Sequence, residues 1–142
     1  MDSDEVTRLY HVWKTVQGML NDRGYVVNQS NLNMNIDEFR SRFDTGSSRE
    51  ALTVLSSKTD EEENRIFVFF TDEAKITIPV LNTYAKRMQS ERVFNAIMIS
   101  RDGISSSARD GIKELQPHFQ IEHFEESELM VNITKHELVP TH

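Results

Sequence analysis

The sequence of 142 residues contains no cysteine. Disulfide bonds, thiolate zinc sites and cysteine nucleophiles are therefore excluded, and the composition suits a reducing compartment. No stretch approaches the roughly 18 consecutive apolar residues that a membrane-spanning helix needs. The first residues, Met1–Glu5, are acidic rather than basic, so they do not form a signal peptide. These absences predict a soluble intracellular protein.

A net positive charge is also missing, because the formal charge is -7 and the isoelectric point is about 5.2. A free-standing DNA-binding protein would more often be basic, since phosphate contacts supply most non-specific affinity. The charge is unevenly distributed. Between Tyr84 and Lys113, six basic residues stand against three acidic ones, an excess of +3 that leaves -10 for the remainder. Only this segment is suited to face a polyanion.

A chain of this length suits one domain with one hydrophobic core. Apolar residues at helical spacing predict a long amphipathic helix from Glu5 to Arg23, with Gly24 as its stop. A short strand is expected at 25–27. A second helix is expected through Ile36, Phe39 and Phe43, with Asn33 or Asn35 as its cap.

Strand and helix patterns continue through the rest of the chain. The sequence predicts a hairpin of strands 52–55 and 65–70 around the acidic turn 60–63, a strand at 75–78, a helix from Pro79 through Val80, Tyr84 and Met88, a strand at 94–99, a helix from Ser105, and a strand at 119–124. Strands alternating with helices favour a sheet covered on both faces, and the hairpin makes it mixed. The expected fold is therefore a three-layer α/β/α sandwich.

One segment looks catalytic. Glu73 and Lys75 form the Glu-x-Lys pattern by which nucleases of the restriction-endonuclease type hold metal ions, and Asp60 could act as the upstream acid. The two carboxylates would hold Mg²⁺, and Lys75 would stabilise the attacking water. Solvated turn residues are the favoured interpretation, because acid-x-Lys triplets are common by chance.

Four of the five histidines lie in the last quarter of the chain, namely His118, His123, His136 and His142. Their spacings match no compact pair of metal ligands, so surface or hydrogen-bonded imidazoles are expected and no metal site is predicted. The nucleophile elbow and the phosphate-binding loop are both absent from the sequence. No cofactor is predicted.

Ser105, Ser106 and Ser107 precede Ala108 and Arg109 at an expected helix start. Hydroxyls and free backbone N–H groups there could bind a phosphate, with Arg109 and Lys113 one turn apart behind them. Such a site positions a duplex without reading its bases. By itself, an ordinary serine-capped helix is the simpler interpretation.

The last fourteen residues, 129–142, read Leu-Met-Val-Asn-Ile-Thr-Lys-His-Glu-Leu-Val-Pro-Thr-His. This run resembles the hinge between the two domains of the fifth subunit shared by eukaryotic nuclear RNA polymerases I, II and III. Further similarities are the segments 22–25, 67–70, 72–75, 83–84, 87–88, 96–97 and 121–124. The resemblance implies a jaw domain over 1–135 and, over 136–142, the start of a linker to a C-terminal assembly domain.

That family has a restriction-endonuclease-like fold without activity, which implies a non-catalytic subunit in the nucleus. A T-P-S-A segment of the family approaches downstream DNA in the lower jaw and falls on Ser105–Ala108 here, with Ser106 in place of the proline. The resemblance implies DNA-proximal roles for residues 105–109 and Lys113. It also implies partner contacts at His136, Glu137, Leu138, Val139 and Pro140.

The partners implied by the resemblance are the largest polymerase subunit, other polymerase subunits, transcription regulators and, weakly within the assembled enzyme, downstream DNA. Two other functions stay open at this point. One is the Mg²⁺-dependent nuclease that would use Asp60, Glu73 and Lys75. The other is a free regulatory adaptor that recognises transcription factors.

Overall fold

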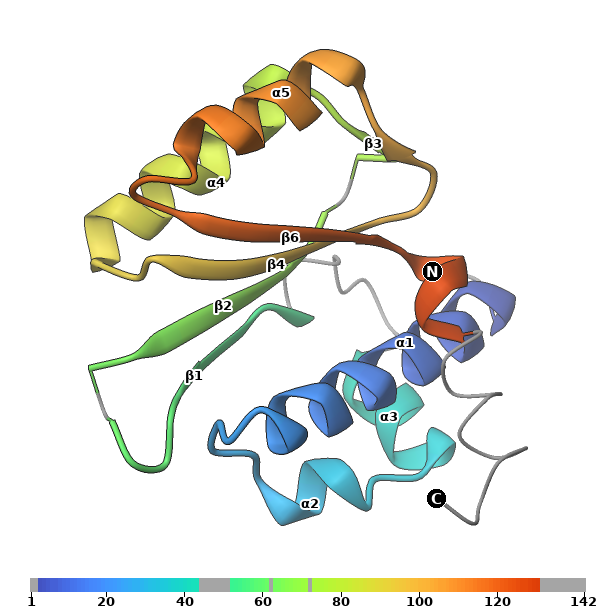
Figure 1. Ribbon diagram of the computed structural model, residues 1–142. Helices are drawn as coiled ribbons and strands as arrows, with labels where there is room; N and C mark the ends of the chain where they lie inside the picture. The colour runs from blue at the N-terminus through green and yellow to red at the C-terminus, as the bar shows by residue number, and fades with distance from the viewer. Residues whose placement is uncertain (1–2, 44–51, 62, 72, 131–142) are drawn as a thin grey trace, which may run out of the picture.

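The structure is a computed structural model that describes residues 3–43, 52–61, 63–71 and 73–130. Two groups of helices enclose a central sheet (Figure 1). The elements are α1 (Ser3–Asp22), α2 (Gln29–Leu32), α3 (Ile36–Phe43), β1 (Val54–Ser57), β2 (Arg65–Phe70), β3 (Lys75–Ile76), α4 (Ile78–Glu91), β4 (Asn95–Ser100), β5 (Gly103–Ile104), α5 (Ser106–Leu115) and β6 (Gln120–Glu125). Residues 126–130 are also helical.

The central sheet has the strand order β1-β2-β4-β6. The pair β1 and β2 is antiparallel, whereas β2 with β4 and β4 with β6 are parallel. The sheet is therefore mixed, as the sequence predicted. The short strands β3 and β5 form a separate parallel pair. The sequence predicted a strand at 75–78, of which β3 occupies Lys75–Ile76, but it predicted neither the two-residue strand β5 nor this pairing.

Side chains of the central strands alternate between two cores. Ile66, Val68 and Phe70 of β2 pack on the side of α1 and α3, while Phe67 and Phe69 pack on the side of α4 and α5. The sheet is buried on both faces, which explains why β2 and β4 are nearly continuous apolar runs. The predicted three-layer α/β/α sandwich is confirmed.

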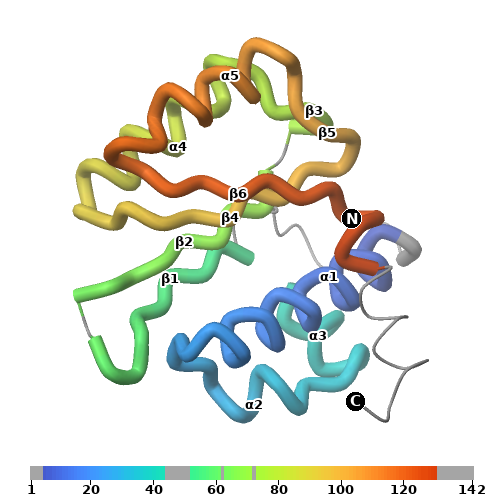
Figure 2. The backbone as a smooth tube through the Cα atoms, in the orientation of Figure 1, coloured from blue at the N-terminus to red at the C-terminus, as the bar shows by residue number. Residues whose placement is uncertain are grey.

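Helix α1 supplies six buried residues of the first core, namely Val6, Leu9, Val12, Trp13, Val16 and Leu20. The segment 126–130 returns beside this helix after β6 (Figure 2). Arg8 pairs with the buried carboxylate of Glu126 at 3.0 Å, and Thr15 Oγ1 donates to the carbonyl of Leu129 at 3.2 Å. Segments from both ends of the chain therefore close the same core.

Several predicted boundaries change for local reasons. Tyr25 forms an isolated bridge with Lys58 rather than a strand, and the helix predicted at 36–43 uses Asn35 as its cap, since Asn35 Oδ1 accepts from the Glu38 N–H at 2.9 Å. Leu52 lies outside β1, which begins at Val54. Ile78 belongs to α4 because the fixed φ of Pro79 suits the first helical turn.

Gly24 ends α1 with a φ of 85°, a conformation that glycine adopts without steric cost. The turn it makes lets the Val26 N–H donate to the Ser57 carbonyl at 2.8 Å, which partly covers the edge strand β1. Across the part of the chain that the structure describes, no helix has the length and apolar character needed to span a bilayer.

Candidate nucleic-acid interface

The start of α5 lies at the end of the sheet where the parallel strands finish. Ser105 is the N-cap, with φ -70° and ψ 156°, and its Oγ accepts from the Ala108 N–H at 3.1 Å. The Ser105 N–H donates to the Ile76 carbonyl at 2.9 Å, so β3 holds the loop in place. The predicted serine-capped helix start is therefore present. The Ser105 hydroxyl is used in this capping bond, so a phosphate would have to bind other groups at the helix start.

Ser106, Ser107 and Arg109 are exposed near the start of α5, and Lys113 is exposed in its last turn. Ala108 is fully buried and packs in the second core, so its role is to seat α5 on the sheet. Arg109 and Lys113 are one helical turn apart on the same face. The structure thus brings three exposed side chains, those of Ser106, Ser107 and Arg109, to the positive end of the helix dipole, whereas Lys113 lies in the last turn of α5.

A hydrogen-bonded pair of side chains lies below the loop, at the ends of β4 and β6. Ser100 Oγ donates to the Gly103 carbonyl at 2.9 Å and accepts from the Gly103 N–H at 3.1 Å. It also lies 2.8 Å from His123 Nε2, so that nitrogen carries the proton in this network. Sequence reasoning did not pair Ser100 with His123, because their contact is diagonal between two parallel strands whose register places Ser100 beside Glu125 and Met98 beside His123.

The pKa of His123 is lowered from its ordinary value, first because burial disfavours the charged imidazolium. The carboxylates of Glu128 and Glu125 oppose this shift, whereas Arg109 adds to it. The neutral imidazole therefore suits the buried Ser100 bond. His123 is half-buried and supports the loop through its bond to Ser100.

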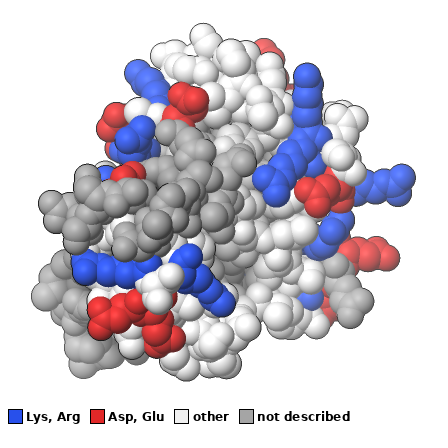
Figure 3. Space-filling view, turned by 180° about the vertical axis from the view of Figure 1, so that it is seen from behind, with Lys and Arg blue, Asp and Glu red and all other residues white. Residues whose placement is uncertain are grey.

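The surface does not carry one continuous basic strip on the face seen in Figure 3. Lysine and arginine side chains gather in separate groups there, and acidic side chains lie among them. Asp102 and Asp110 stand beside Arg101 and Arg109 in the sequence. Such mixed charges do not attract a duplex strongly.

The three residues of the nuclease hypothesis do not come together. Asp60 lies in the turn before β2, while Glu73 and Lys75 follow its far end. A strand of 6 residues separates them, and such a strand spans about 20 Å. Asp60 therefore does not share a metal ion with Glu73, and this hypothesis was wrong. Asp72 lies outside the described residues.

The histidines form no site in the described part of the chain. His118 is exposed just after α5, whereas His123 is held by Ser100. Among the residues the structure describes, no group of three or more His, Asp or Glu side chains is arranged to hold a metal ion. His136 and His142 lie outside those residues, as do the predicted partner contacts Glu137, Leu138, Val139 and Pro140.

The fold and this helix start define a class of protein: an α/β sandwich domain that presents a capped helix N-terminus and two cations. The family model for the N-terminal domain of RNA polymerase Rpb5 matches residues 3–88. The chain is 38% identical, over 99% of its length and 69% of the relative's, to subunit RPABC1 of DNA-directed RNA polymerases I, II and III from Caenorhabditis elegans.

Relatives from two other organisms are also similar to this chain. The DNA-directed RNA polymerase subunit 5-like protein 1 of Arabidopsis thaliana is 38% identical over 96% of this chain and 67% of its own length. RPABC1 of Dictyostelium discoideum is 33% identical over 98% of this chain and 68% of its own length. The chain therefore belongs to the RNA polymerase Rpb5 family.

Proposed function

We propose that this chain is a non-catalytic domain of the fifth subunit shared by nuclear RNA polymerases I, II and III. The observation that carries the proposal is 38% identity to the nematode subunit over 99% of the chain. Residues 1–135 would form the jaw domain, and residues 136–142 would begin the linker to the assembly domain. Its place is the lower jaw of the enzyme, in the nucleus.

The helix start of α5 supports a position near downstream DNA. Arg109 is exposed near this helix start, and Lys113 is exposed one turn further along α5. The helix start carries the positive end of the dipole, which favours a phosphate there. The net charge of -7 opposes binding of DNA by the chain alone. Contact with DNA therefore depends on the polymerase, which holds the helix start against the duplex.

Attachment must come from protein surfaces, because an exposed ion pair contributes only about 0–1 kcal/mol. We expect the largest polymerase subunit to meet His136, Glu137, Leu138, Val139 and Pro140, together with surfaces of the assembly domain. Transcription regulators would use other exposed parts of the jaw. The domain would thus contribute shape and contacts, while other subunits perform the chemistry.

Affinity purification tests the assignment. The full-length protein that carries this chain, tagged in its own cells, should bring down subunits of all three nuclear polymerases. A variant with alanine at positions 136–140 should recover less of the largest subunit, whereas alanine at the exposed Arg42 should recover as much as the unchanged protein. Recovery of regulators without any polymerase subunit would instead support the free adaptor.

A further inference from the structure

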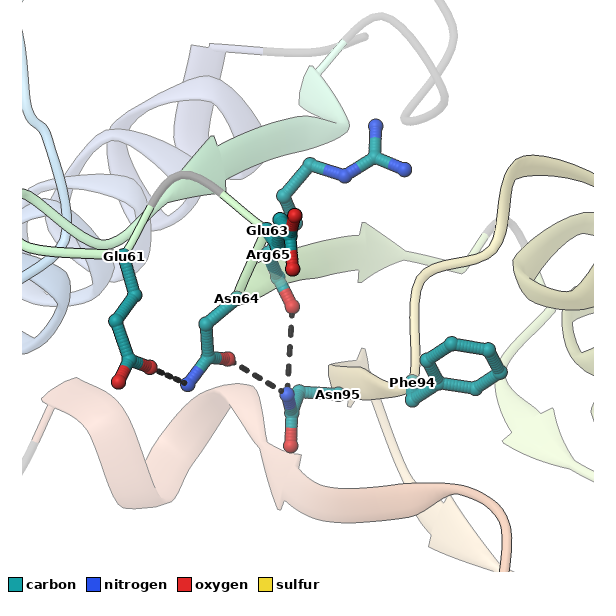
Figure 4. A pocket seen from close by; sticks show the side chains of 6 residues that line it. All are labelled: Glu61, Glu63, Asn64, Arg65, Phe94 and Asn95. Atoms are coloured by element: carbon teal, nitrogen blue, oxygen red, sulfur yellow. Dashed lines mark hydrogen bonds between the residues drawn. The ribbon is translucent and has the colours of Figure 1, made fainter.

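A hollow of about 720 Å³ opens at the other end of the sheet, where β2 and β4 begin. It is lined by Glu61, Glu63, Asn64, Arg65, Phe94 and Asn95 (Figure 4). Two distant segments build it, the hairpin turn before β2 and the residues that lead from α4 into β4. Neither the DNA-facing helix start nor the hinge segment includes any of these residues.

Phe94 is the apolar part of the hollow. It is 50% exposed, and it is the only exposed residue among the 8 phenylalanines of the chain. Its ring stacks on Phe119 with 5.8 Å between the ring centroids. A large aromatic side chain that is supported by a neighbour and still open to solvent is the type of residue that anchors protein interfaces.

The polar wall of the hollow is fixed by hydrogen bonds. Asn95 Nδ2 donates to Asn64 Oδ1 at 3.2 Å, and Asn64 Nδ2 donates to Glu61 Oε2 at 3.4 Å (Figure 4). Arg65 Nη2 donates to the Glu91 carbonyl at the end of α4. The shape of the hollow is therefore set before any partner arrives, which limits the entropy lost on binding.

The charge around the hollow selects a cationic partner. Asp60, Glu61 and Glu63 are exposed at this end, and Arg65 is the cation among the lining residues. The guanidinium of Arg65 bonds to the end of α4, where the helix dipole is negative. Carboxylates and a helix C-terminus repel phosphates, so a nucleic acid does not fit here.

We propose that this hollow is a docking site for a protein segment that combines an aromatic or aliphatic side chain with neighbouring lysine or arginine residues. The apolar side chain would cover Phe94, and the cations would pair with Glu61 and Glu63. This proposal does not depend on the polymerase assignment. Because the hollow and the start of α5 lie at opposite ends of the sheet, both can be occupied together.

Selection from a random-peptide display library on the 142-residue chain tests the proposal. Enriched peptides should place lysine or arginine beside an aromatic or aliphatic residue. They should bind Phe94→Ala at least about tenfold more weakly, the loss expected of an interface anchor. The double reversal Glu61→Lys with Glu63→Lys should weaken binding as well, and salt should weaken binding to the unchanged chain.

Two controls match these variants in kind and exposure. Val26→Ala removes an exposed apolar side chain elsewhere, and Glu114→Lys reverses an exposed charge on α5, so neither should alter peptide binding. Amide shifts of the isotope-labelled chain with a selected peptide should concentrate at Asn64, Phe94 and Asn95. Thermal melting checks that Phe94→Ala is folded. If Phe94→Ala does not fold, the charge-reversal variant tests the site instead.

Five outcomes would overturn the proposal. The selection could enrich no peptide, or peptides without basic residues. The Phe94→Ala and charge-reversal variants could bind selected peptides as tightly as the unchanged chain. The amide shifts could lie away from the hollow. Finally, self-association of the chain that is lost in Phe94→Ala would assign the hollow to a second copy rather than to a different protein.

Discussion

The two ends of the central sheet have opposite chemistry. At the carboxyl ends of β2, β4 and β6, α5 begins with a serine cap and exposes Arg109, and Lys113 follows one turn further along the helix. At the amino ends, the acidic turn, the exposed Phe94 ring and the last carbonyls of α4 lie together. Helices that run antiparallel to the strands bring positive dipole ends to one edge and negative ends to the other.

This difference shows how one small sheet separates two binding surfaces. The strands β2 and β4 have 6 residues each, and at this length they hold the two ends about 20 Å apart. That distance exceeds the roughly 8–10 Å over which exposed charges act in physiological salt. The charges of the acidic turn therefore have little effect on Arg109 at the start of α5.

The largest expected effect comes from weakening the sheet that separates the two ends. Phe69 is fully buried, with its ring centroid 4.8 Å from that of Phe67 and 4.5 Å from that of Tyr84. Phe69→Ala should lower the free energy of unfolding by about 3–5 kcal/mol, because it leaves a cavity. Urea denaturation measures this. Val26→Ala, at a residue that is 56% exposed, should change the free energy of unfolding by no more than about 0.5 kcal/mol. Equal losses of stability in the two variants would contradict the two-core description.

The basic end can be tested next, within the assembled polymerase. Replacing Arg109 and Lys113 together by alanine should reduce crosslinking to downstream DNA by between a few-fold and about tenfold, since each exposed charge contributes only about 0–1 kcal/mol. Each lost phosphate contact should also lower the salt slope by about 1. Arg42→Ala on α3 serves as the matched control. Unaltered crosslinking would remove this helix start from the DNA path.

A smaller effect should come from restoring the family proline at the same helix start. Ser106 is the first helical residue and is exposed, and Ser105 before it has the extended ψ of 156° that a following proline requires. Ser106→Pro should therefore raise the free energy of unfolding by about 0.4–1 kcal/mol. Thermal melting measures the gain. Proline at exposed Lys113, within α5, should instead destabilise the fold.

The smallest effect concerns pH at the basic end. Burial lowers the pKa of His123 in the folded state, so the unfolded chain binds the proton more readily. The stability that the neutral His123 imidazole contributes is fully present above the pKa of histidine in the unfolded chain, which is about 6.5. It declines as pH falls below that value. His123→Gln keeps a donor for Ser100 and should flatten this part of the stability profile. Parallel profiles for the two proteins would show that His123 does not titrate on unfolding.

The sequence predicted the long elements well because their periodic patterns depend on short-range structure. The helix from Glu5 to Arg23 and the strands around Phe67 and Ile97 agree with α1, β2 and β4. The short elements α2 and β5 were missed, because a few residues carry too little periodicity. Phe94 was assigned to a strand, although β4 begins one residue later and leaves its ring exposed.

For the candidate site, the local pattern predicted the Ser105 cap and the exposed cations behind it. The pairing of Ser100 with His123 could not be predicted, because it depends on the register that places Ser100 beside Glu125 and Met98 beside His123. The nuclease hypothesis failed for a related reason. Sequence spacing does not reveal that β2 carries Asp60 and Glu73 to opposite ends of the sheet.

By itself, the sequence determined the family of this protein, the class of its fold and the helix start that could meet phosphate. These follow from residue identities, backbone propensity and nearest neighbours along the chain. The tertiary structure decided which residues share an end of the sheet, which of its many aromatic rings stays exposed, and which carboxylates stand too far apart to act together. Those outcomes depend on strand order and register, which arise only when distant segments pack.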